Sequence, residues 1–88
     1  MAKKKFEIKD VKVGIDTWGH EYLDSFLVKA SDGSKVYLDP MVSGCITEIE
    51  EMTAGEQVDW GREQIGKHIF CDEISSQSFV AVGKTYII

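Results

Sequence analysis

Four residues near the C-terminus, His68, Cys71, Asp72 and Glu73, are of the types that bind metal ions. On an extended strand His68 and Asp72 point to one side, whereas Cys71 and Glu73 point to the other. His68 and Cys71 could then share an ion only across a bulge, and a zinc site would need two further ligands at suitable spacing. We therefore predict no metal site and no cofactor.

The other candidates for catalysis are two thiols and two pairs of adjacent carboxylates. Cys45 falls on an apolar stripe of helical spacing, where a thiol stays protonated and unreactive. Neighbouring carboxylates such as Glu50 and Glu51 diverge along the chain, and the sequence has neither a Ser/His/Asp signature nor a phosphate-binding glycine loop. We predict that the protein is not an enzyme and that both cysteines, Cys45 and Cys71, are reduced.

Aromatic and basic residues in the segment 26–37 indicate a different chemistry. Residues 22–30 and 35–38 read as two strands joined by a turn at Asp32-Gly33. With that turn at the tip, Ala30 opposes Lys35, which places Phe26, Tyr37 and Lys35 on one face. Two rings and a cation suit stacked bases and a phosphate. The alternative, which we favour, is that these rings belong to the core.

Two tryptophans lie in polar surroundings. Trp18 follows Asp16-Thr17 in a predicted loop, and Trp60 stands between Asp59 and Gly61. Such residues either cap one end of a small core or serve as exposed recognition anchors. We favour the cap for both, because a small barrel has open ends.

Acidic residues gather in the middle of the chain, as a candidate surface for a basic protein partner. This acidic patch consists of Glu48, Glu50, Glu51, Glu56 and Asp59. The formal charge of −5 is uneven, because residues 1–35 hold seven lysines and six acids, whereas residues 36–88 hold three basic residues and nine acids. Binding of nucleic acid depends on phosphate neutralisation by Lys and Arg, so this balance disfavours it.

The elements that would position these residues are mainly strands. We predict a basic arm over residues 1–5 and strands over 6–15, 22–30, 35–38, 65–74 and 79–88. The first strand changes the parity of its apolar residues after Ile8, which predicts a bulge near Lys9-Asp10. Asp39 as N-cap and Pro40 at the first helical position predict a helix that ends near Thr53-Ala54-Gly55.

Three strands, a helix and two strands follow one another along the chain. In this order the chain resembles the oligonucleotide/oligosaccharide-binding (OB) fold, and the resemblance covers the element order and the bent first strand. It implies one five-stranded barrel over residues 6–88 with the helix between strands 3 and 4, and an SH3-like barrel is the alternative. The core should include Phe6, Val11, Val13, Ile49, Ile69 and Val82.

The resulting hypothesis is a non-catalytic binding protein, a small acidic accessory factor or inhibitor from a phage or a bacterium. It would act in the cytoplasm through protein contacts made by the acidic patch, since the sequence shows no signal peptide and no membrane span. The alternative is a binder of single-stranded nucleic acid that uses the aromatic hairpin. The chain would be a monomer, or a homodimer that pairs through residues 79–88.

Overall fold

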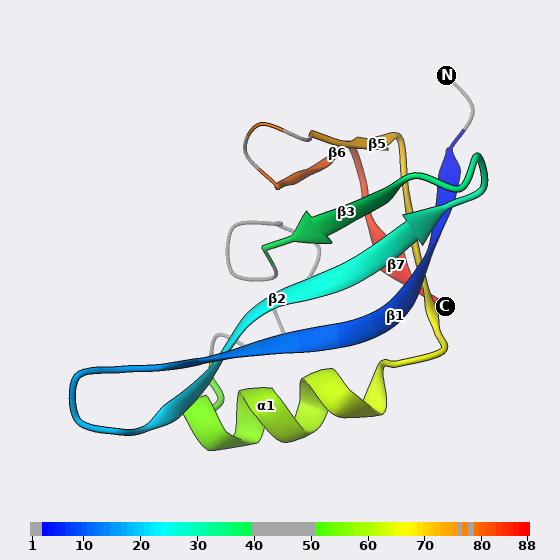
Figure 1. Ribbon diagram of the computed structural model, residues 1–88. Helices are drawn as coiled ribbons and strands as arrows, with labels where there is room; N and C mark the ends of the chain where they lie inside the picture. Colours follow the sequence, from blue (N-terminus) through cyan, green and yellow to red (C-terminus); the bar gives the residue numbers. More distant parts are fainter. Residues whose placement is uncertain (1–2, 40–50, 76, 78) are drawn as a thin grey trace.

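The computed structural model describes residues 3–39, 51–75, 77 and 79–88 of the 88-residue chain. Its elements are β1 (Lys4–Ile15), β2 (Glu21–Ala30), β3 (Lys35–Leu38), α1 (Ala54–Glu63), β4 (His68–Cys71), β5 (Glu73–Ile74), β6 (Ala81–Val82) and β7 (Tyr86–Ile87). Five strands form an antiparallel sheet in the order β3-β2-β1-β4-β7, and β5 pairs with β6 in a small second sheet (Figure 1).

Among the described residues the fold is therefore mainly β, with one helix between the third and fourth strands, as the sequence predicts. The large sheet is open rather than closed into a barrel, since β3 and β7 are its two edges among the described residues. Two predicted strands are each divided. The segment 65–74 gives β4 in the large sheet and β5 in the small one, and the segment 79–88 gives β6 and β7. No helix in the described part of the chain has the length and apolar character to cross a bilayer.

The long strand β1 contains the predicted bulge. Its register against β2 shifts between Ile8 and Asp10, which leaves Lys9 as the extra residue. Phe6 and Ile8 are buried before the shift, and Val11 and Val13 pack against the same core after it. The bulge thus lets apolar residues of both parities reach one core. Strand β1 also begins earlier than predicted, because residues 4 and 5, expected in the basic arm, pair with β4.

The β2–β3 hairpin forms as predicted, but its register is shifted by one residue. Lys29, not Ala30, lies opposite Lys35, and Phe26 lies opposite Leu38. The cause is the turn: the Ala30 N–H donates to the Ser34 carbonyl over 2.8 Å, so the loop holds three residues rather than four. A shift of one residue moves side chains to the opposite face. Phe26 and Tyr37 are therefore on opposite faces of the sheet.

The helix lies in a stretch where the sequence analysis placed the end of a helix. The helix predicted after Asp39 falls mostly on residues 40–50, outside the described residues, whereas α1 starts at Ala54. Thr53 is its N-cap: the Thr53 hydroxyl accepts from the Glu56 N–H, and the Glu56 carboxylate accepts from the Thr53 N–H, both at 3.3 Å. Because this Thr-x-x-Glu capping box starts a helix at Thr53, Gly55 lies inside α1 and not at the end of a helix, where the prediction placed it.

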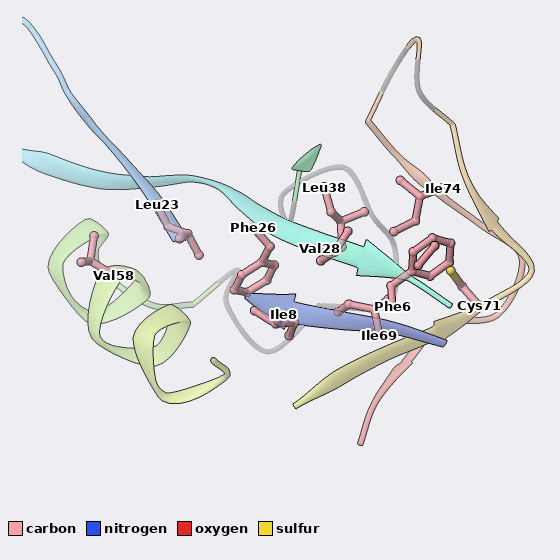
Figure 2. Packing of buried hydrophobic residues seen from close by; sticks show 11 residues of the cluster. Phe6, Ile8, Leu23, Phe26, Val28, Leu38, Val58, Ile69, Cys71 and Ile74 are labelled. Atoms are coloured by element: carbon pink, nitrogen blue, oxygen red, sulfur yellow. The ribbon is translucent and has the colours of Figure 1, made fainter. Parts of the chain in front are cut away.

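The core lies on one face of the large sheet, where α1 packs mainly against β2. Figure 2 shows Val58 of α1 near Leu23 at one end of the core, and Ile74 beside Phe6 and Cys71 at the other. Of the predicted core, Phe6 and Ile69 are buried and Val11 and Val13 are partly buried. Val82 is exposed, contrary to the prediction, and Ile49 lies outside the described residues.

Candidate functional site

The β1–β2 hairpin extends past the N-terminal end of α1 and away from the rest of the molecule (Figure 1). It contributes to an elongated shape with extents of 42 × 24 × 23 Å. We call residues 15–22 the hairpin tip. The tip exposes three large apolar side chains: Trp18 at 81%, Ile15 at 67% and Tyr22 at 38% of their surface. An apolar group of this kind at the end of a projecting hairpin is typical of a contact surface.

Asp16 holds the loop of the tip in one conformation. Its Oδ1 atom accepts hydrogen bonds from the N–H groups of Trp18 and His20, each at 2.9 Å. Its Oδ2 atom lies 3.7 Å from Nδ1 of His20, and its main-chain N–H donates to the His20 carbonyl at 2.9 Å. Gly19 closes the loop at a φ of +81°, which suits glycine. Trp18 is therefore exposed on an ordered loop.

The two tryptophans have different roles, whereas the sequence analysis favoured a cap for both. Trp60 is partly buried on α1, with its ring centroid 5.9 Å from that of Phe26, so it covers the core as predicted. Trp18 does not cap the core, because the two strands carry their loop beyond it. Ile15 and Tyr22 were not predicted as site residues. The alternation of apolar residues along a strand does not show where that strand extends beyond the core.

The described members of the predicted acidic patch are all exposed. Glu51 precedes α1, and Glu56 and Asp59 lie on it, whereas Glu48 and Glu50 are outside the described residues. The Glu56 carboxylate is already used in the capping box. Asp59 also lies on α1, and none of the described hydrogen bonds gives its side chain a role in the cap. It can therefore be changed without loss of the cap.

The predicted aromatic hairpin face does not form as one surface. Phe26 is fully buried in the core, whereas Tyr37 is 44% exposed and shares the opposite face of the sheet with the exposed Lys35. The Nζ atom of Lys12 lies 5.7 Å from the centroid of the Tyr37 ring. A shallow hollow beside them is lined by Asp10, Val11, Lys12, Leu27 and Tyr37.

The residues considered for metal binding or for thiol chemistry are held apart. Cys71 is fully buried, and its thiol donates to the Glu73 carbonyl at 3.5 Å. His68 is half-buried and lines a second hollow, on the same face of the sheet as Tyr37, with Lys5, Glu7 and Lys29. Within the described ranges, no three His, Cys, Asp or Glu residues are grouped as a metal site would require.

Comparisons with protein-family models, with curated proteins and with solved structures gave no match for this chain. Any functional conclusion therefore rests on the chemistry and placement of its own residues.

Proposed function

We propose that the protein is a non-catalytic binding module that inserts its hairpin tip into an apolar pocket of a partner protein. The observation that carries the proposal is the exposure of Trp18 on a loop that Asp16 holds in place. As an accessory factor or inhibitor it would act by occupying a surface of that partner. We place this activity in the cytoplasm, where the two cysteines, Cys45 and Cys71, would stay reduced.

An ordered tryptophan is an effective anchor for a protein partner. Tryptophan and tyrosine dominate the residues whose removal costs most binding energy, because they bury a large area with few rotatable bonds. Since the main-chain hydrogen bonds to Asp16 already fix the loop, little conformational entropy remains to be lost on binding. Ile15 and Tyr22 add exposed apolar area on the two faces of the hairpin, since Tyr22 lies opposite Gly14 and Ile15 opposite Glu21.

The charge around the tip indicates the chemistry of the partner. Asp16 and Glu21 lie in or beside the loop, and α1 adds the exposed carboxylates of Glu56, Asp59 and Glu63. A pocket with basic residues at its rim would complement this surface. Such charges mainly raise the rate of association, and salt screens them.

The test begins with capture of a partner by the tagged full chain, followed by titration of the purified partner by calorimetry. Trp18→Ala should weaken binding by about 2 kcal/mol or more, about 30-fold in the dissociation constant. Ile65→Ala is the matched control, because Ile65 is also an exposed apolar residue but lies just after α1. Asp59→Lys should slow association and reduce its dependence on salt.

A spectroscopic measurement locates the contact independently. With Trp60→Phe, Trp18 is the only tryptophan in the chain, so its emission should shift to the blue when the partner covers it. An unshifted emission at saturation, or equal affinities for Trp18→Ala and the parent protein, would refute the hairpin tip as the binding site.

A further inference from the structure

The face of the large sheet that points away from the core combines lysines with aromatic rings. We call it the outer face. Strand pairing arranges it in three rows: Lys5–Phe70–Tyr86, then Lys35–Lys29–Glu7–His68, then Tyr37–Leu27–Asp10. The two shallow hollows, one lined by His68 and one by Tyr37, both open on this face, at the second row and the third row respectively.

Positive charge is concentrated on the outer face, although the chain as a whole carries −5. Lys5, Lys29 and Lys35 belong to adjacent strands. Lys12 and Lys84 lie over rings of the same face. This region thus has five lysines and three carboxylates, those of Glu7, Asp10 and Asp24. Much of the negative charge in the described residues lies instead on α1 and the hairpin tip.

Two of the nearby carboxylates are paired with lysines. Glu7 lies 3.2 Å from Nζ of Lys9, and Asp24 lies 4.0 Å from Nζ of Lys12. Because lysines outnumber carboxylates on the outer face, the local field that a ligand meets there is positive. The net charge of the whole chain does not describe that field, because charges beyond about 8–10 Å are screened in physiological salt.

The rings are accessible and each lies near a cation. Tyr37 and Tyr86 are exposed, and Phe70 stands between Lys5 and Tyr86 in its row. The Nζ atom of Lys84 lies 5.6 Å from the centroid of the Tyr86 ring. A side-chain hydrogen bond with Tyr86 raises the pKa of Lys84, so this ammonium group stays charged at neutral pH.

We infer that the outer face binds single-stranded nucleic acid. Bases that are not paired can stack on Tyr37, Phe70 and Tyr86, while Lys5, Lys29 and Lys35 contact the phosphates between them. A duplex would offer this face only its phosphates, because its bases are already stacked. Four strand spacings of about 4.8 Å separate β3 from β7, so a single strand would cross roughly 19 Å of sheet.

The experiment measures fluorescence anisotropy of labelled oligo(dT) and oligo(U), each about 12 nucleotides long, against the full chain. Low salt should give the tightest binding, and both ligands should bind, because stacking tolerates either sugar. Tyr37→Ala should weaken binding about fivefold to a hundredfold, whereas Tyr37→Phe keeps the ring and should bind within about twofold of the parent protein. Circular dichroism and the unfolding midpoint check that Tyr37→Ala still folds.

The lysines are tested by the slope of log K against log salt. Lys29→Gln together with Lys35→Gln should reduce that slope by about 1.4, since each phosphate contact to a single strand contributes about 0.7. Lys67→Gln is the matched control, because Lys67 is an exposed lysine just before β4 that lines neither hollow. It should leave the slope close to that of the parent protein.

Three results would overturn the inference: no binding at low salt, an equal effect of Tyr37→Ala and Tyr37→Phe, or equal binding of poly-glutamate. The last would mean that the outer face recognises charge alone, as for an acidic protein segment. Trp18→Ala should leave oligonucleotide binding unchanged, and Tyr37→Ala should leave the protein partner of the hairpin tip bound. Failure of one proposal is therefore distinguishable from failure of the other.

Discussion

Two isoleucines of β1 test which part of this strand lies in the core and which part projects beyond it. Ile8 is fully buried immediately before the bulge, whereas Ile15 is 67% exposed at the far end of the strand. Ile8→Ala removes a side chain from the packed core and leaves a cavity, which should cost about 3 kcal/mol of the free energy of unfolding. Ile15→Ala should cost less than about 0.5 kcal/mol, because its side chain is largely in water in both states.

The backbone contacts of Ile8 are unaffected by this substitution. Its N–H donates to the Lys67 carbonyl at 2.8 Å, and its carbonyl accepts the Gly66 N–H at 2.9 Å. The measured loss is then a side-chain effect. A domain of 88 residues has a stability of about 4–13 kcal/mol, so the variant should still fold over most of that range. If the stability of the parent protein is at the low end of this range, Ile8→Val can be used instead. It should cost about 0.5–1.5 kcal/mol of the free energy of unfolding.

The assay is urea unfolding followed by circular dichroism, with thermal unfolding as a second measure. The midpoint temperature of Ile8→Ala should fall by roughly 12–24 °C, since 1 kcal/mol corresponds to about 4–8 °C in a domain of this size. The slope of the free energy of unfolding against urea concentration should equal that of the parent protein, because the same surface is exposed on unfolding. Equal losses for Ile8→Ala and Ile15→Ala would refute the burial of Ile8 in the core and the projection of Ile15 beyond it.

Three further outcomes are expected. The thiol of Cys71 should react slowly until denaturant is added, in a Cys45→Ser background, because it is fully buried. Thr53→Ala should cost about 1 kcal/mol by removing the capping box of α1, measured by urea unfolding. Ser34→Ala should raise the pKa of Asp32, followed by carboxyl NMR, because the Ser34 hydroxyl and N–H hydrogen-bond the carboxylate and hold that pKa below its ordinary value.

Each of these predictions has a control or an opposite result that would contradict it. Fast labelling of Cys71 without denaturant would show an accessible thiol. Thr17→Ala, in the exposed tip, should leave stability unchanged and so isolates the capping effect of Thr53. For Asp32 the lowered pKa means that any stability it adds is present above the unfolded pKa and is lost as pH falls through the folded one. A Ser34→Ala protein with an unchanged Asp32 titration would contradict the hydrogen-bond assignment.

Local patterns in the sequence predict local geometry well where one side chain or one parity change decides it. The switch of apolar parity after Ile8 is enough to predict the bulge at Lys9, because burial and a period of two leave little choice. The bounds of β3 follow in the same way from a turn and four alternating residues. By contrast, the sequence analysis took Gly55 as the end of a helix and did not use the Thr-x-x-Glu pattern at Thr53, although glycine can end a helix or lie inside one.

Features that depend on the register between strands are not accessible from the sequence. The three-residue turn at Asp32-Gly33 decides whether Tyr37 shares a face with Phe26, and a loop one residue longer would reverse the answer. The outer face brings together Lys5, Phe70 and Tyr86, which are far apart along the chain and meet only through β4. Their pairing is set by tertiary contacts rather than by composition.

The second bulge of the β1–β2 pair separates the two proposed surfaces. The register shifts again between Lys12 and Val13, where β2 inserts Asp24 as its extra residue. Before this shift, residues of β1 lie within the five-stranded sheet and contribute to the outer face. After it, the two strands continue only with each other and carry Trp18 beyond the body of the protein (Figure 1). Because the hairpin tip lies beyond the strands that form the outer face, one need not be blocked when the other is occupied.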